Sequence, residues 1–79
     1  MGQVRQNIVG QRLKQARSAS LPPLTQEEIS RRLAKQGVSI DRAGIAKIEM
    51  GIRGVLDYEV VAIAKALGVE VLWLLGTRG

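Results

Sequence analysis

The chain contains no cysteine, no histidine and no phenylalanine, and each absence narrows what the protein can be. Without cysteine there is no disulfide to supplement the core and no cysteine-based metal site. Without histidine as well, the commonest general base, the thiol nucleophile and the tight transition-metal ligands are all missing. We therefore expect neither an enzyme nor a protein that carries a cofactor.

Aromatic residues make up only 3% of the chain, and no stretch alternates apolar and polar residues in the period of a half-buried strand. No apolar run approaches the roughly 20 residues that span a bilayer, and no charged start leads into an apolar signal segment. We expect an all-α, cytoplasmic protein that has no membrane partner.

Basic residues are in excess, because 12 Lys and Arg against 7 Asp and Glu give a formal net charge of +5. This excess suits a polyanionic partner, although it also serves solubility. The 79 residues suffice for one domain, which buries only about 60% of the surface that its unfolded chain exposes. The composition therefore favours a small basic binding domain.

The spacing of apolar residues predicts a first helix from about Val4 to Ser18, with Val9, Leu13 and Ala16 on one face. It ends before two consecutive prolines, which cannot continue a helix.

Helix caps mark the next two helices. A capping box begins the second helix, because the Thr25 hydroxyl can accept from the backbone of Glu28, whose carboxylate can reach back. Gly37 is the residue expected to end it in a left-handed conformation. Asp41 is predicted to be the N-cap of a third helix, which Gly51 ends.

Asp57 is predicted to cap a fourth helix, which Gly68 closes. Its inward stripe consists of Val60, Ile63, Ala64 and Leu67. The segment Val69–Leu75 that follows is almost wholly apolar, so it must be buried.

The second and third helices, Thr25–Gln36 and Asp41–Met50, have the arrangement of a helix-turn-helix. At 100° per residue, Ile45 and Ile48 point into the protein. The opposite side presents Ala43, Lys47 and Met50. Small residues on this face would let the helix approach the edges of DNA bases closely.

Four segments carry a family resemblance: QRLKQAR at 11–17, LTQEEI at 24–29, IAKIEMG at 45–51 and AKALGV at 64–69. In this order they resemble the Xre family, the Cro and cI-type phage repressors and their bacterial relatives. The resemblance covers roughly Ile8 to Gly76. It implies a compact five-helix bundle of the lambda-repressor-like DNA-binding type, with the helix-turn-helix at Thr25–Met50. Residues 1–7 are then expected to be a flexible N-terminus, 8–76 the domain and 77–79 a tail.

The resemblance also implies roles for single residues. Gln26 matches the glutamine that holds a DNA phosphate, and Arg53 matches the loop that grips the DNA backbone. Arg42, Ala43 and Lys47 fall on the positions that read bases, where arginine and lysine can donate to guanine O6 and N7.

The same family pairs an arginine of its first helix with a glutamate near the end of the third, here Arg17 and Glu49. We expect this pair to be structural and, if exposed, to contribute only about 0–1 kcal/mol. Each DNA contact has a plainer alternative. Arg42 and Lys47 can be solvated charges, and Gln26 can be an ordinary polar residue of a first turn.

Two features depart from the family's pattern. The chain between Leu33 and Ile45 is longer than usual, and the extra residues, within Ala34–Ser39, either add a turn to the second helix or enlarge the loop. Gly44 costs about 0.5–1 kcal/mol inside a helix, so close approach of DNA or of a neighbouring helix would explain it, unless it is a tolerated defect.

The apolar tail is the predicted site of self-association, because the corresponding helix of the family lies at the edge of the dimer interface. Trp73 and Leu74 are the candidate dimer contacts, and an exposed Trp73 would act as an anchor. The alternative is core packing by Val71, Leu72 and Leu75.

The sequence thus predicts a sequence-specific transcriptional regulator, most simply a repressor, that binds double-stranded DNA at a palindromic operator as a homodimer. No small-molecule ligand is evident. The alternative is a protein-interaction module of the same fold, an antitoxin-like or adaptor protein, which the sparsely charged outer face of Asp41–Met50 also fits.

Overall fold

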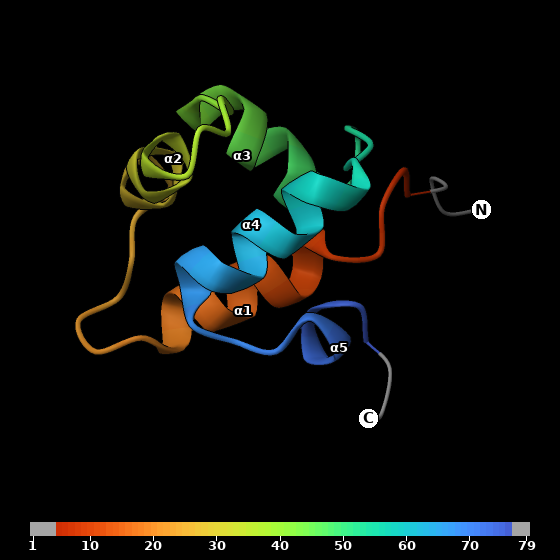
Figure 1. Cartoon of the computed structure of the whole chain (residues 1–79). Coiled ribbons are helices and arrows are strands. Elements are labelled where there is room, and N and C mark those ends of the chain that lie inside the picture. The colour runs from red at the N-terminus through yellow and green to blue at the C-terminus, as the bar shows by residue number, and fades with distance from the viewer. Residues whose placement is uncertain (1–4, 77–79) are drawn as a thin grey trace.

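Helices account for the regular structure of residues 5–76, the part of the chain that the computed structural model describes (Figure 1). They are α1 (Gly10–Ala19), α2 (Gln26–Lys35), α3 (Arg42–Met50), α4 (Asp57–Leu67) and α5 (Val71–Leu74). No strand occurs in that range, so the prediction of an all-α fold is confirmed. The radius of gyration, 11.7 Å, is close to the value of about 12 Å expected for a compact domain of this length.

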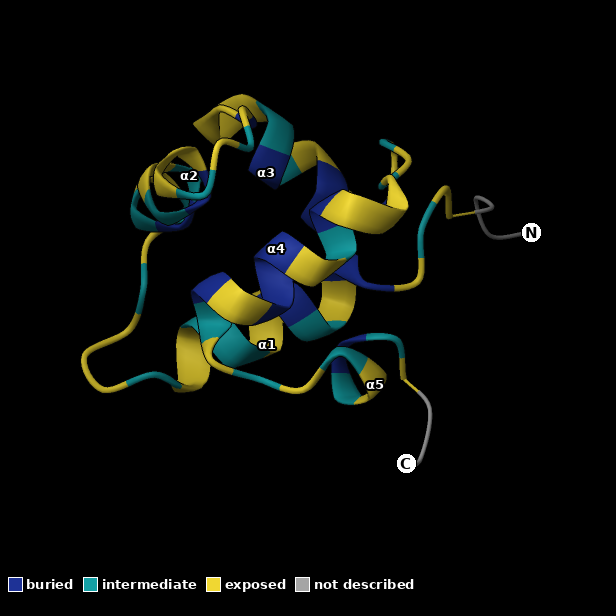
Figure 2. Cartoon of the chain, viewed as in Figure 1, coloured by how far each residue is buried: buried dark blue, intermediate teal, exposed yellow. Residues whose placement is uncertain are grey.

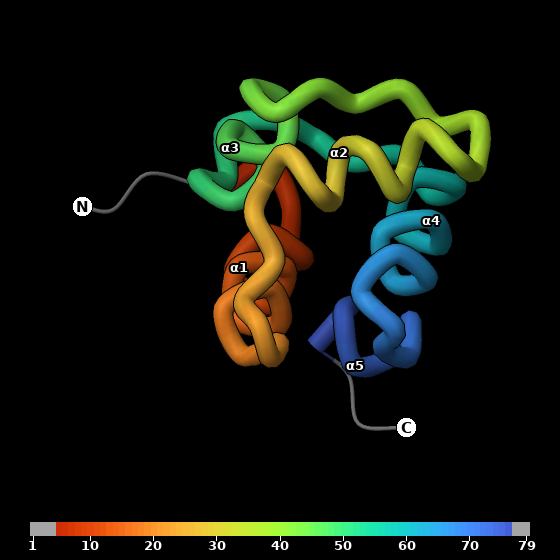
Figure 3. Tube along the Cα trace, turned by 90° about the vertical axis from the view of Figure 1, so that its left-hand side faces the viewer, coloured from red at the N-terminus to blue at the C-terminus, as the bar shows by residue number. Residues whose placement is uncertain are grey.

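The helices α1 and α4 lie side by side in the middle of the molecule, with α2 and α3 at one end and α5 at the other (Figures 1 and 3). Each helix contributes to a single core. The core residues that are fully buried are Val9, Leu13, Ile29, Leu33, Ile45, Ile48, Ile63 and Leu74. In α4, the predicted stripe residues Ile63 and Ala64 are buried, whereas Val60 and Leu67 are only partly so.

The second helix has the ends that its sequence predicts. The Thr25 hydroxyl accepts from Glu28 N at 3.0 Å, but the Glu28 carboxylate pairs with Arg31 and Arg32 instead of reaching back. At the other end Gly37 adopts a φ of +79°, a conformation that costs glycine little. The backbone N–H groups of residues 37 and 38 then bond to carbonyls of the last turn, which ends the helix as a Schellman motif.

The third helix also begins and ends as predicted, because Asp41 Oδ1 accepts from Gly44 N at 2.7 Å and Gly51 is left-handed. Of the range 34–39, in which the extra residues were expected, residues 34 and 35 belong to α2 and residues 36–39 lie in the connection. Ile40 is buried in the core, and its carbonyl accepts a 2.6 Å hydrogen bond from the Ser30 hydroxyl. The longer connection is therefore held in place at its end.

Two predicted helix starts are wrong. The first helix begins at Gly10, not near Val4, because Asn7 Oδ1 accepts from the N–H groups of residues 9 and 10 at 3.0 and 2.7 Å. In α4, Asp57 is the first helical residue rather than the cap. The capping acceptor is Glu59, whose carboxylate takes a 3.0 Å bond from the N–H group of residue 56.

The apolar tail is buried by different residues than expected. Leu74 has 0% of its surface exposed, so it is a core residue and is not available as a dimer contact. Leu72, which was expected to pack in the core, is 52% exposed. Val71 and Leu75 pack partly buried against the core, as predicted.

Candidate nucleic-acid interface

The helix α3 is anchored on one side and open on the other. Ile45 and Ile48 are both fully buried, which fixes the inner side of the helix. Ala43, Lys47 and Met50 are exposed, as the helical period predicts, and so is Arg42 at the start of the helix. The helix therefore presents two cations and a small side chain to solvent.

The ion pair predicted between Arg17 and Glu49 is present, and it joins three helices. Arg17 Nε and Nη2 donate to the two Glu49 oxygens at 2.8 and 2.9 Å. Gln26 Nε2, from α2, donates to the same carboxylate at 3.1 Å. The hydrogen bonds from the guanidinium to Glu49 raise the pKa of Arg17 above its ordinary value. Glu49 thus holds α1 and the start of α2 to the end of α3.

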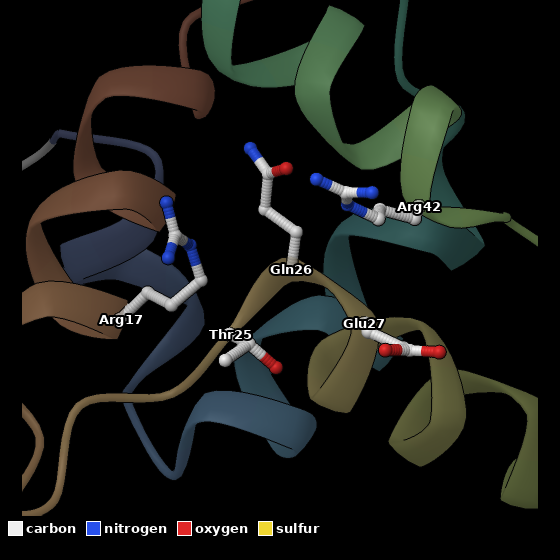
Figure 4. A pocket seen from close by; sticks show the side chains of 5 residues that line it. All are labelled: Arg17, Thr25, Gln26, Glu27 and Arg42. Atoms are coloured by element: carbon white, nitrogen blue, oxygen red, sulfur yellow. The ribbon is translucent and has the colours of Figure 1, made fainter.

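A shallow pocket of about 480 Å³ lies where α2 and α3 begin. Its lining residues are Arg17, Thr25, Gln26, Glu27 and Arg42. Figure 4 shows the Gln26 amide between Arg17 and Arg42, with the Arg42 guanidinium directed toward it and Glu27 turned away. The fold therefore brings together Gln26, the predicted phosphate contact, and Arg42, a predicted base contact.

The cations of this surface differ in how far their charge is already neutralised. Arg17 is paired with a buried carboxylate. By contrast, neither Arg42 nor Lys47 forms an ion pair with any residue in the range 5–76. These two side chains keep their positive charge available to an anionic partner.

Arg53, the predicted grip on the DNA backbone, is held by the protein itself. Its Nη1 and Nη2 atoms lie 3.0 and 3.1 Å from the two carboxylate oxygens of Glu59, which is almost completely buried. These bonds raise the pKa of Arg53 and lower the pKa of Glu59. The main role of the Arg53 side chain in this structure is to fasten the loop after α3 to the start of α4.

The lowered pKa of Glu59 predicts a pH dependence of stability. The pair with Arg53 stabilises the fold above the ordinary pKa of 4.5, and this contribution is lost as pH falls below 4.5 through the lowered pKa. We expect Glu59→Gln to lower the free energy of unfolding by about 1–2 kcal/mol at neutral pH. Urea unfolding at several pH values measures this, and the two proteins should converge as the pH approaches about 2. Parallel pH profiles would contradict it.

Gly44 is explained by the protein's own packing. A Cβ atom at this position would lie 2.8 Å from Ile40 Cγ2 and 3.1 Å from Asp41 Oδ1. The first distance is shorter than real Cβ contacts allow, and Ile40 is buried. Close approach of the connection before α3 therefore accounts for this glycine without any DNA contact.

Residues 5–7 contact the end of α3, which sequence reasoning missed. Asn7 Nδ2 donates to the carbonyls of Ile48 and Arg53 at 3.0 and 2.8 Å. Arg5 Nη2 donates to the carbonyl of residue 49 at 2.9 Å, and the N–H of residue 6 donates to the carbonyl of Gly51 at 2.7 Å. The last carbonyls of a helix have no partner within it, so these residues cap α3. Of the predicted flexible ends, residues 1–4 and 77–79 lie outside the described residues.

The structure gives Trp73 an intramolecular partner. Its ring is partly buried against the core, and the Arg12 guanidinium lies 4.9 Å from the ring centroid. This is a cation–π contact between α1 and α5. Trp73 is therefore not the exposed anchor that the dimer prediction required.

No family model, curated protein or solved structure matches this chain. Within residues 5–76, no group of three or more acidic side chains is placed to hold a metal ion. None of the helices in that range has the length and apolar character needed to cross a bilayer.

Proposed function

We propose that this chain is a sequence-specific DNA-binding regulator of transcription, a lambda-repressor-like helix-turn-helix protein of the Xre type, in which α3 enters the major groove. One observation carries this proposal. Ala43 and Lys47 are exposed on the side of α3 opposite the buried Ile45 and Ile48, and Arg42 is exposed at the start of the same helix. A helix anchored in this way can contact a DNA duplex while its inner residues stay buried in the protein core.

Each exposed residue has a chemical task in this proposal. Arg42 and Lys47 donate to guanine O6 and N7, and the Ala43 methyl packs against a thymine methyl. Gln26 uses the donor capacity of its amide to hold a phosphate beside Arg42, because phosphate contacts fix the position of the protein on the duplex. A homodimer would bind a palindromic operator and repress by excluding polymerase.

The primary test is selection of bound sequences from a random pool of duplex DNA at about 150 mM salt. We expect a palindromic sequence to be enriched, because two copies of α3 would read two half-sites. Failure to enrich any sequence, together with no binding to DNA in dilute buffer, would overturn the proposal.

Lys47→Ala tests base reading at one position. We expect a loss of about 1–3 kcal/mol on the selected sequence and a relaxed preference at one base pair, because the lysine donates to a base edge. Fluorescence anisotropy with selected and scrambled DNA measures both. Lys35→Ala is the matched control, since Lys35 lies at the end of α2 away from α3 (Figure 3) and should change neither. Equal small losses on both DNAs from Lys47→Ala would count against base reading.

A protein-interaction module is the second candidate, favoured by exposed apolar side chains at the end of α3 and just after it. Met50 and Ile52 are both exposed, and Arg53 beside them is neutralised by Glu59. This candidate predicts weak binding to DNA. The proposed regulator instead predicts binding whose logarithm falls steeply and linearly with the logarithm of salt concentration, because phosphate-bound counterions are released.

A further inference from the structure

The helix α4 carries an outward stripe that no other part of the described chain covers. Asp57, Tyr58, Val61 and Lys65 are all exposed, and at 100° per residue they share one side of the helix. More than half of the surface of Tyr58 and of Val61 is open to solvent. In Figure 2 the exposed segments of α4 face the viewer, away from α1. An apolar centre with charged ends is the composition of a docking surface.

The charges of this stripe are arranged symmetrically about Val61. Asp57 is one helical turn before it and Lys65 one turn after it. Neither side chain forms an ion pair within residues 5–76. In the same range, the Asp57 carboxylate accepts a hydrogen bond only from the adjacent N–H of Tyr58. The stripe therefore has a negative end, an apolar middle and a positive end. Its charges are opposite in sign to the helix dipole, because the acidic residue lies at the positive, N-terminal end of the helix.

We propose that this stripe binds a second copy of the chain, with the two α4 helices antiparallel about a two-fold axis through Val61. Such an axis sets Asp57 of each protomer against Lys65 of the other, so the surface is complementary to itself. The two Val61 and two Tyr58 side chains then meet between the charge pairs. Antiparallel packing also places opposite ends of the two helix dipoles together.

The charge pattern selects this occupant over other partners. An unrelated protein would need to supply a positive group, an apolar group and a negative group at matching one-turn intervals, which this chain already carries. The inference deepens the proposed function, which needs a homodimer for a palindromic site, but the pairing itself does not depend on DNA.

Sedimentation velocity of the whole chain, without DNA, tests the pairing. We expect a monomer–dimer equilibrium for the unaltered protein. Asp57→Lys and Lys65→Asp each set like charges opposite one another at both contacts, so each should weaken association by about tenfold or more. An equimolar mixture of the two variants should restore it, because every contact in the mixed pair joins a lysine to an aspartate.

Restored association in the mixture also shows that both variants are folded. Val61→Arg should abolish pairing by placing two like charges on the axis. Lys14→Asp makes the same charge change as Lys65→Asp but lies on α1, so it should leave pairing unchanged. A monomeric unaltered protein, or a mixture that associates no better than either variant alone, would overturn the proposal. Restored pairing in a protein that fails to bind DNA would overturn the proposed function and leave this inference standing.

Discussion

Replacing Glu49 by alanine is expected to lower the free energy of unfolding by about 3–5 kcal/mol, because it leaves a shielded charge without its partner. The Glu49 side chain is 5% exposed and that of Arg17 is 16% exposed, so water cannot fully replace the lost carboxylate. Gln26 loses its acceptor as well. Thermal unfolding followed by circular dichroism should show a midpoint lower by more than about 12 °C.

The matched control removes both charges at once. Replacing Arg17 by methionine and Glu49 by leucine in the same chain should recover most of the lost stability, because an apolar pair of similar volume leaves no buried charge. If Glu49→Ala instead costs less than about 1 kcal/mol, the pair behaves like an exposed one and does not hold the three helices together.

Gly10→Ala is expected to cost about 3 kcal/mol, the upper part of the range for an overpacked site. A Cβ atom at this position would overlap the backbone oxygen of Ile48, the penultimate buried residue of α3. A backbone carbonyl cannot rotate away as a flexible side chain can, so α1 and α3 would have to separate. Urea unfolding measures the loss.

Gly54→Ala is the control for this substitution. The nearest atom to a Cβ at that position is 4.0 Å away, so we expect a change within about 0.5 kcal/mol. Similar losses at both glycines would show that Gly10 matters for backbone freedom rather than for the close contact with α3.

The helix ends that could be predicted are those set by local chemistry. Thr25 and Asp41 cap with their own side chains, and Gly37, Gly51 and Gly68 end helices because each adopts a positive φ. These features depend on residues at most five apart in the chain, so pattern and residue type suffice to find them.

The mispredicted start of α1 involves distant partners, unlike that of α4, where Glu59 bonds to residue 56. Asn7 stops α1 from starting earlier, and the same side chain bonds to the carbonyls of Ile48 and Arg53, more than 40 residues away. Asparagine is a preferred capping residue, so its bonds to residues 9 and 10 had a local signal, whereas its bonds to Ile48 and Arg53 had none.

The candidate site could also be predicted only in part. The period of α3 correctly placed Ala43, Lys47 and Met50 at its surface. It said nothing of how each cation is partnered. Arg53 is held by Glu59, and whether a cation is free or neutralised depends on which carboxylate the fold brings near it.

The contacts of residues 5–7 with α3 bear on how the protein should be handled. They place the start of the described chain beside the last turn of the helix that we propose meets DNA. A purification tag fused ahead of them would be anchored next to that helix and could perturb binding measurements. Because α5 lies at the opposite end of the molecule from α3, the chain beyond α5 is the better attachment point for a tag, a dye or a biosensor surface (Figure 1).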